Sequence, residues 1–337
     1  MTPSWDERRR AEATARAAAL RERGRLGVMD QERIDIFQEI DRAGIWLMFQ
    51  PLTNLYGFYQ RIGDVAGVVV HSGHPRPLQR FTAAHEYGHH VLGHSLSLDT
   101  QAEIEGQPTD AADPLAEIAA QAFAGALLMP LHLVNQVAAD HNIDFGSPSP
   151  SQVYVLAVRF GVSYQAMRTQ LRAYGLVTAD VFGELDVPPV RIKESLGNGE
   201  APADRRADLW VLTEDTAPTG MLLQVDDEVI VRVREAASTG YRWRLGDHDR
   251  SVLALIDDRC VEPPDGEVLG ATRTRSLRFR AGEPGVSSVR LGLSRAFGAG
   301  TQIETLNVDI AVASPVTGDS PSGLYVDQHA KLAARTR

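Results

Sequence analysis

The sequence predicts an α+β domain followed by an all-β antiparallel sandwich or barrel. In residues 26–185, segments with helical periodicity surround a short region of β-branched and aromatic residues with interspersed glycines. In residues 206–314 the apolar residues recur with a period of two, which is typical of half-buried strands. Residues 186–205 between them are rich in proline, glycine and charge and predict a linker. The 337 residues suffice for two or three domains.

The composition is that of a folded, water-soluble protein without disulfides. The chain has 34 basic and 44 acidic residues, a net charge of −10, which does not suit a dedicated nucleic-acid binder. Cys260 is the single cysteine, so no disulfide can form within the chain. The first ten residues are polar and charged, and no apolar run reaches the roughly 18 residues of a membrane span. We therefore expect a cytoplasmic protein that does not bind membranes.

The elements of the first half are predicted from local patterns. Residues 1–25 contain many strong helix formers and charges and predict a solvated helix that acts as a tether or faces a partner. Residues 44–70 predict short strands with tight turns. A helix-turn-helix-like pair is predicted within 148–178 around Gly161. The predicted helices cover residues 30–42, 78–94, 114–129, 152–160 and 163–174.

The second half contains four clear strand patterns separated by turn residues. Each alternates apolar and polar side chains, and their short spacing favours an antiparallel arrangement. After them, residues 315–337 predict a flexible tail. The four patterns cover residues 228–234, 276–280, 289–293 and 306–312.

The strongest chemical signal is the sequence HEYGH at residues 85–89. Six of the ten histidines lie between residues 71 and 94. On a helix, four steps of about 100° place His85 and His89 on one face, one turn apart, so that both rings can bind one ion. Glu86 lies beside them and can take a proton from water held at that ion. This is the HExxH arrangement of zinc hydrolases, and the ion we expect is Zn²⁺, with Mn²⁺ as the alternative. A chance match on a surface helix is the other interpretation, but the apolar residues around the motif predict a buried helix.

The third protein ligand has to come from elsewhere in the chain. A catalytic zinc usually has three protein ligands and one open position. The metzincin branch requires a histidine six residues after His89, but that position is serine. Glu117 is favoured, because it begins a helix rich in small residues that can pack closely against the motif helix; its other interpretation is a first-turn acid that complements the helix dipole. His94, about 140° around the helix from His89, is expected to lie outside the ligand set or in solvent. The downstream acids are Asp99, Glu103, Glu105, Asp110, Asp113 and Glu117, with Asp113 as the reserve ligand.

Two blocks of the sequence, residues 80–94 and 117–130, resemble the ImmA/IrrE family of bacterial metallopeptidases. The resemblance extends over about 31–185, with tyrosine at 87 where leucine is common and glutamine at 121 where asparagine is common. It implies a zincin-like metallopeptidase domain with a small sheet, an HExxH helix and a helical bundle. It also implies a gluzincin-like site in which His85, His89 and Glu117 bind zinc and Glu86 is the base.

The same resemblance implies a substrate inside the cell. That substrate is a helix-turn-helix transcriptional repressor, often encoded by a neighbouring gene, whose cleavage releases stress-response or mobile-element genes. The chain's own helix-turn-helix-like segment has few basic residues, Arg159, Arg168 and Arg172. We therefore expect it to support the peptidase fold and not to contact nucleic acid directly.

Residues 209–313 resemble chagasin-type cysteine-protease inhibitors, which have an immunoglobulin-like fold. The resemblance rests on Ser-Thr-Gly-Tyr-Arg-Trp at 238–243 and Arg-Ala-Phe at 295–297, where the family commonly has Arg-Pro-Trp. Because of such departures we expect a sensing or substrate-docking module more than an inhibitor. The other interpretation of the two loop aromatics is that they pack inside the sandwich. The partner-binding residues implied are Thr239, Gly240, Tyr241, Trp243, Arg295 and Phe297.

Two functions from different classes therefore remain. The first is a zinc endopeptidase that cleaves a regulatory protein. The second is a non-catalytic interaction or sensor protein whose C-terminal sandwich binds a partner such as a protease. Zinc content and cleavage of the neighbouring repressor distinguish them.

Overall fold

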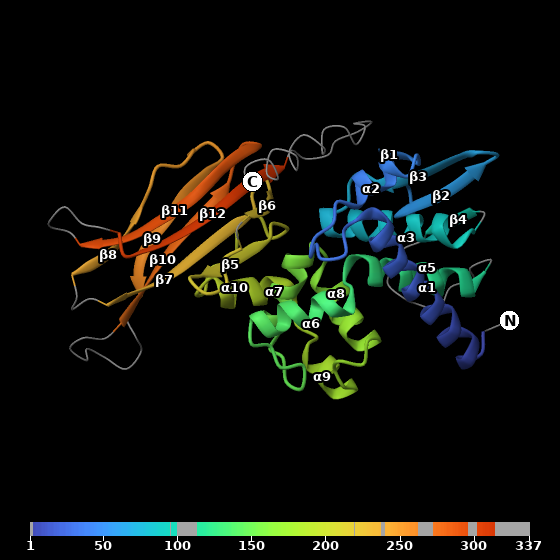
Figure 1. Cartoon of the computed structure of the whole chain (residues 1–337), viewed down its shortest axis with the longest axis horizontal. Helices are drawn as coiled ribbons and strands as arrows, with labels where there is room; N and C mark the ends of the chain where they lie inside the picture. The colour runs from blue at the N-terminus through green and yellow to red at the C-terminus, as the bar shows by residue number, and fades with distance from the viewer. Residues whose placement is uncertain are drawn as a thin grey trace. The chain divides into compact units, whose positions relative to one another are not determined.

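In the computed structural model the chain divides after Val187 into two units, each with its own core (Figure 1). The structure describes residues 3–94, 96–99, 113–218, 220–236, 240–261, 272–295 and 302–313.

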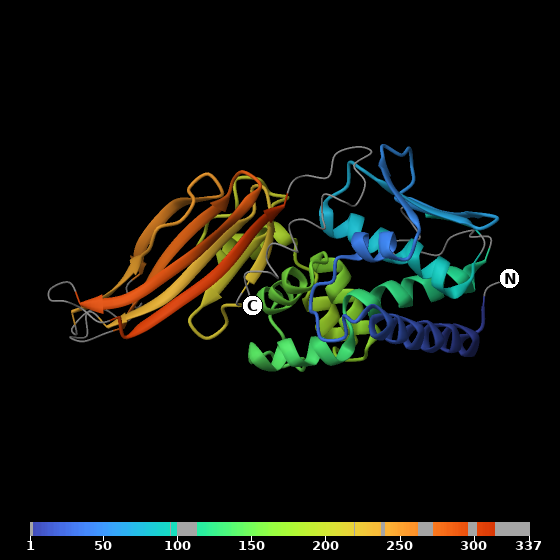
Figure 2. The ribbon, with the colours of Figure 1, turned by 45° about the horizontal axis from the view of Figure 1, so that its top comes forward.

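The first unit contains a four-stranded sheet with the order β1-β3-β2-β4. β1 and β3 are parallel, whereas β2 is antiparallel to both β3 and β4. Val68, Val70 and Tyr59 are at most 1% exposed, which shows that one face of the sheet is packed against the protein. Helix α3 (Arg76–Leu92) lies along the sheet (Figure 2). The strands are β1 (Trp46–Gln50), β2 (Gly57–Ile62), β3 (Val65–His71) and β4 (Leu96–Asp99).

Besides the sheet and α3, the first unit consists of further helices. α5 (Pro114–Leu128) packs against α3 on one side and against α1 (Trp5–Leu26) on another. The buried guanidinium of Arg80 on α3 donates to the carbonyl of Gly161 at 2.9 Å, which ties α3 to the end of a further helix, α7. The other helices are α2 (Ile36–Arg42), α6 (Leu131–Asp140), α7 (Pro150–Phe160), α8 (Tyr164–Ala173) and α9 (Ala179–Glu184).

Helix α1 is part of the core and is not the solvated tether that its composition predicted. Ala15 and Ala19 are 0% exposed, because their small side chains let α1 lie close to α5. Arg23, also 0% exposed, donates to the carbonyls of Leu127 and Val28, both at 2.7 Å. The buried guanidinium of Arg23 thus forms hydrogen bonds with carbonyls at the end of α5 and in the chain after α1. The role of this charged residue is structural.

The helix-turn-helix-like segment consists of α7 and α8 joined at Gly161, whose φ of +65° ends α7. Its three arginines are used within the protein. Arg159 donates two hydrogen bonds to Glu32, both at 2.8 Å, and Arg168 donates one to Asp186 at 2.7 Å. Arg172 donates to the carbonyl of Val177. These three arginines stabilise the fold through contacts within the protein, so their guanidinium groups are poorly placed to contact the phosphates of a nucleic acid.

Among the described residues, one helical stretch of 27 residues, Pro114–Asp140, is long and apolar enough to span a membrane. The sequence had predicted no apolar run of that length. The stretch contains α5 and α6, and most of its apolar window is buried inside the protein, as in the core helices of many proteins. It is therefore weak evidence for a membrane span.

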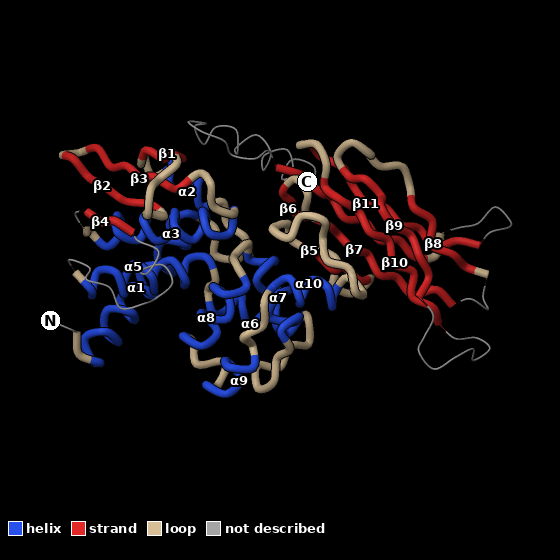
Figure 3. The backbone as a smooth tube through the Cα atoms, turned by 180° about the vertical axis from the view of Figure 1, so that it is seen from behind, coloured by secondary structure: helices blue, strands red, loops and turns tan. Residues whose placement is uncertain are grey.

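The second unit is a sandwich of two four-stranded sheets, ordered β5-β7-β10-β9 and β6-β12-β11-β8 (Figure 3). Val231, Leu277, Leu291 and Val308 are 0% exposed and belong to the core between the sheets. The two sheets are mixed and not purely antiparallel, because β5 pairs in parallel with β7 and β6 with β12. The strands are β5 (Leu209–Thr213), β6 (Gly220–Gln224), β7 (Glu228–Ala236), β8 (Tyr241–Leu245), β9 (Leu253–Val261), β10 (Thr272–Ala281), β11 (Gly285–Arg295) and β12 (Glu304–Ala313).

The segment predicted as a linker, residues 186–205, contains helix α10 (Pro189–Leu196). Ile192 is 2% and Lys193 is 4% exposed. The ammonium group of Lys193 donates to the carbonyls of Arg205 and Ala207, and burial lowers its pKa. The segment is therefore structured, because α10 packs on β5 and Lys193 holds the following turn. The predicted tail, residues 315–337, lies outside the described residues.

Candidate metal site

Helix α3 brings His85 and His89 together on one face, as the spacing of four residues predicts. Both side chains are 1% exposed, and their Nε2 atoms are 3.0 Å apart. The two rings meet at an interplanar angle of 62° with centroids 4.8 Å apart. Two buried imidazole nitrogens thus point toward one place, next to the packing contact between α3 and α5.

Glu117, in the first turn of α5, supplies the third side chain. Its Oε2 lies 3.2 Å from Nε2 of His85, and its Oε1 lies 3.6 Å from Nε2 of His89. Among the described residues, these three form a group whose candidate ligand atoms all lie within 4.8 Å of one another. The structure therefore brings together, from two helices, the three side chains that the sequence proposed as ligands.

The geometry fits a small divalent ion. Zinc binds imidazole nitrogen and carboxylate oxygen at about 2.0–2.2 Å in a tetrahedral arrangement, which requires neighbouring ligand atoms about 3.3–3.6 Å apart. The separations here are 3.0, 3.2 and 3.6 Å, so small side-chain shifts bring all three into that range. A set of two imidazoles and one carboxylate also suits a borderline-soft ion such as zinc. These residues could hold a metal with one coordination position left for water or substrate.

Small side chains allow α3 and α5 to approach closely enough to build the site. A Cβ added to Gly88 would lie 3.0 Å from Cδ1 of Phe123 and 3.4 Å from Cα of Ala120. Gly88 lies between the two motif histidines in sequence, and Ala120 follows Glu117 by three residues. The glycine inside the motif therefore permits the close packing that places Glu117 beside the histidines.

Glu117 is held in its charged form. Burial acts to raise the pKa of this carboxyl, but its hydrogen bonds and electrostatic interactions with His85 and His89 outweigh that effect and lower the pKa to about 2. A carboxylate that stays ionised at neutral pH is the form that binds a cation.

The reserve ligand Asp113 has a different role. Its Oδ1 accepts hydrogen bonds from the backbone N–H groups of Leu115 and Ala116, at 3.1 and 3.2 Å, and so caps the N-terminus of α5. It is not in the ligand group of the described residues. Asp113 instead fixes where α5 begins and thereby where Glu117 lies. Of the other acids considered, Glu103, Glu105 and Asp110 lie outside the described residues, as does the side chain of Asp99.

Glu86, the predicted base, is 0% exposed and lies beneath strand β2. Its Oε1 is 3.3 Å from the position that a Cβ on Gly57 would occupy, and that Cβ would also collide with Thr82 and the carbonyl of Val69. The absence of a side chain at Gly57 therefore lets β2 approach α3 directly over Glu86. The role of Glu86 in proton transfer stays a prediction.

The sequence did not reveal the contacts that hold the motif helix against α1. The hydroxyl of Tyr87 donates to Glu22, and the guanidinium of Arg25 binds Glu22 at 2.6 Å and Tyr87 at 3.2 Å. Burial, followed by the contact with Glu22, raises the pKa of Tyr87, so its hydroxyl keeps its proton. The one available signal was a tyrosine at a motif position where the resembling family commonly has leucine.

Four of the six predicted partner-binding residues of the sandwich lie among the described residues. Trp243 is 2% exposed, and its indole N–H donates to the carbonyl of Arg234 at 3.0 Å, so it is a core residue and its prediction as a partner contact was wrong. Tyr241 and Arg295 are paired across β8 and β11, and the guanidinium lies 4.9 Å from the ring centroid. Gly240 adopts a φ of +75° in the turn before β8. Thr239 and Phe297 lie outside the described residues.

Comparison with known families assigns a domain to each unit. Residues 40–172 match the IrrE N-terminal-like domain, a peptidase family, and residues 223–312 match the chagasin family of peptidase inhibitors. Both resemblances predicted from the sequence are thereby confirmed. No curated protein matches the chain.

Solved structures similar to this chain include a cysteine protease inhibitor. A cysteine protease inhibitor from Entamoeba histolytica, EhICP2, is 21% identical, with a TM-score of 0.29, and the match covers 32% of this chain and 96% of the inhibitor. Amebosin is 16% identical, with a TM-score of 0.27, covering 31% of this chain and 97% of that protein. PbICP-C, solved in complex with falcipain-2, is 13% identical with a TM-score of 0.23, covering 32% and 90%.

Proposed function

We propose that this chain, which carries an IrrE N-terminal-like peptidase domain and a chagasin-like domain, is a zinc-dependent endopeptidase. The observation that carries the proposal is the convergence of His85, His89 and Glu117 from two helices, with ligand atoms 3.0 to 3.6 Å apart. Among described residues, no other group of three or more potential ligands gathers in this way.

Within the proposal, each side chain has one role. A bound zinc ion would lower the pKa of its water toward about 7 and polarise a peptide carbonyl. His85, His89 and Glu117 hold the ion. Glu86, one residue after His85 and shielded from bulk solvent, accepts a proton from water and delivers it to the leaving amine. Strand β2 and helix α3 cover this carboxylate, so that it does not form hydrogen bonds with bulk water.

For the substrate we propose a regulatory protein, a helix-turn-helix transcriptional repressor encoded near this chain, cleaved in the cytoplasm to release stress-response or mobile-element genes. The match to the IrrE N-terminal-like domain supports this class of substrate. The arginines of the chain's own helix-turn-helix-like segment are bound to carboxylates and carbonyls, which favours a protein substrate over direct contact with DNA.

The test combines metal analysis with cleavage of the neighbouring repressor by the full chain. We expect one zinc per chain and cleavage that His89→Ala abolishes together with the zinc. Glu86→Gln should keep the zinc and slow cleavage by about 10²–10⁴-fold, because it removes the proton acceptor and no ligand. His132→Ala, at an exposed position on α6, is the matched control and should behave as the unaltered chain.

The alternative is a non-catalytic interaction protein whose sandwich binds a partner such as a protease. The pairing of half-buried Tyr241 with exposed Arg295 across β8 and β11 favours it, because an aromatic ring and a guanidinium side by side are typical of interfaces. It predicts a chain without zinc, or cleavage that His89→Ala leaves unchanged. Either result would contradict the endopeptidase.

A further inference from the structure

His89 uses both of its ring nitrogens. Its Nε2 faces His85 and Glu117, whereas its Nδ1 lies 2.8 Å from Nδ1 of His94. The rings of His89 and His94 meet at 64° with centroids 4.9 Å apart, an edge contact and not a stack. The second nitrogen of a candidate ligand is therefore held by a histidine from outside the ligand group.

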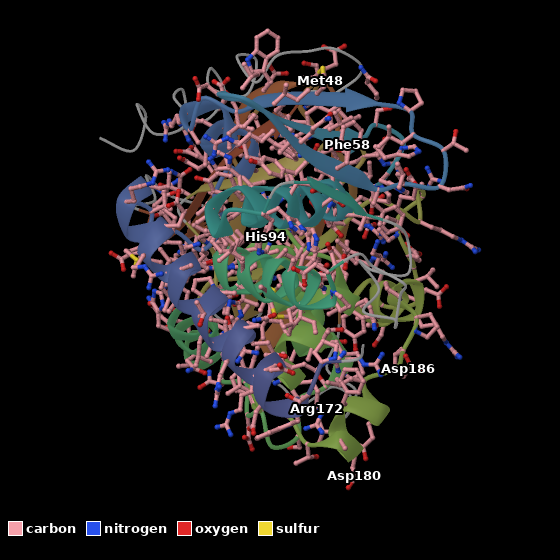
Figure 4. The ribbon with its side chains drawn as sticks, turned by 90° about the vertical axis from the view of Figure 1, so that its right-hand side faces the viewer. Met48, Phe58, His94, Arg172, Asp180 and Asp186 are labelled. Atoms are coloured by element: carbon pink, nitrogen blue, oxygen red, sulfur yellow. The ribbon has the colours of Figure 1, made fainter. Side chains whose placement is uncertain are left out.

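The end of helix α3 puts His94 in this place. Gly93 has a φ of +78°, a left-handed conformation that glycine adopts without cost, and it ends the helix. The backbone N–H of His94 then donates to the carbonyl of His89 at 2.9 Å. The chain thus folds back over the last turn, whereas a continuing helix would carry residue 94 about 140° away from residue 89. Figure 4 labels His94 at this end of α3.

The protons in this contact follow from the ligand geometry. A histidine that binds a metal through Nε2 carries its proton on Nδ1. The Nδ1–H of His89 therefore donates to Nδ1 of His94, which accepts with its lone pair and carries its own proton on Nε2. A hydrogen bond of this kind fixes the tautomer and the ring orientation of the ligand.

Two other roles for His94 fit the structure less well. As a fourth ligand it would have to direct a lone pair at the ion, but its Nδ1 is directed at His89, and the ligand group of the described residues contains three members. A merely solvated ring would be exposed, whereas His94 is half-buried against His89.

We propose that His94 is a positioning residue for the metal site: its Nδ1 accepts from His89 and holds the His89 ring with Nε2 aimed at the ion. This inference rests on the proposed metal site and adds a residue that the ligand set does not contain. Loss of such a partner is expected to weaken metal binding by about 10–100-fold.

The experiment compares three forms of the full chain by zinc competition against a chromophoric chelator. His94→Phe keeps a ring of similar size and removes the acceptor. His94→Asn is the rescue variant, because its Oδ1 stands as many bonds from Cβ as Nδ1 of histidine does and can accept the same proton. We expect His94→Phe to bind zinc about 10–100-fold more weakly and His94→Asn to stay close to the unaltered chain. The visible spectrum of the cobalt-loaded chain should change in His94→Phe and be retained in His94→Asn.

The outcomes separate this inference from the proposed function. If the unaltered chain binds zinc no better than His89→Ala, the metal site itself fails, and the role of His94 fails with it. If the unaltered chain binds zinc and His94→Phe binds it equally well, only the positioning role is overturned. Equal weakening in His94→Phe and His94→Asn also overturns it, because a packing role and not the hydrogen bond would then explain the loss.

Discussion

The two units bury charged side chains in different ways, and the difference separates a structural pair from a candidate site. In the sandwich, the side chain of Glu228 is 1% exposed and binds Arg278 at 2.5 Å, so each charge has a partner of opposite sign. In the first unit, His85, His89 and Glu117 all direct potential metal-ligand atoms toward one place. Burial of polar side chains is thus common to both units. Convergence of two imidazoles and a carboxylate, with no lysine or arginine among them, is what indicates a candidate metal site.

The largest expected effect comes from removing the charge of Glu228 in the sandwich pair. Glu228→Gln should destabilise the second unit by about 3 kcal/mol, because the buried guanidinium of Arg278 loses its shorter ionic contact and keeps only the one with Glu200 at 3.4 Å. Hydrogen exchange, read separately for peptides of each unit, measures the loss. Glu117→Gln is the matched variant in the first unit and should cost less than Glu228→Gln in metal-free protein while removing zinc binding. Equal losses of stability in the two variants would contradict the distinction.

Zinc should stabilise one unit and not the other. At a free zinc concentration 100 times Kd, the first unit is expected to gain about 2.7 kcal/mol, because only the folded state assembles the ligands. Scanning calorimetry with zinc and then with a chelator should show the transition of the first unit shift and that of the sandwich stay. A shift of both transitions, or one that persists in His89→Ala, would argue against a specific site.

A smaller effect tests the close approach of α3 and α5. Gly88→Ala places a methyl group 3.0 Å from Phe123, and we expect a loss of about 1–3 kcal/mol together with weaker zinc binding. Gly24→Ala on α1 is the control, since a Cβ there meets nothing within 4 Å and alanine favours the helix by about 1 kcal/mol. Urea unfolding with zinc titration reports both quantities. Undiminished zinc affinity in Gly88→Ala would show that the site tolerates a wider helix separation.

Much of the fold was predictable where side chains alternate or repeat over several turns. The four strand patterns of the sandwich correspond to β7, β10, β11 and β12, the inner strands of the two sheets. The edge strands β5, β6, β8 and β9 were not individually predicted. Two of them, β5 and β6, pair in parallel with their neighbours. The direction of a strand relative to its neighbour depends on the path of the chain and not on the alternation of apolar and polar side chains.

The mispredicted segments share one physical cause. α1 buries alanines and the guanidinium of Arg23, and α10 buries the ammonium group of Lys193, so small or charged side chains occupy positions where large apolar ones would be expected. Their burial is stabilised by hydrogen bonds to carbonyls that are distant in sequence, such as that of Leu127. Trp243 likewise follows a turn motif that left two interpretations open, partner contact or packing inside the sandwich, and its place in β8 directs it into the core. Such partners are chosen by the tertiary fold.

The sequence by itself determined the chemistry and the local spacing of the motif. It specifies two imidazoles one helical turn apart, with a carboxylate between them in sequence. The helix repeat alone is enough to place His85 and His89 on one face. Only the tertiary structure decided that Glu117 meets them and that His94 turns back onto His89. Those contacts need α3 and α5 to touch at Gly88 and Ala120, and they need the chain to reverse at Gly93. Close packing between separate elements sets such distances, and no local pattern contains that information.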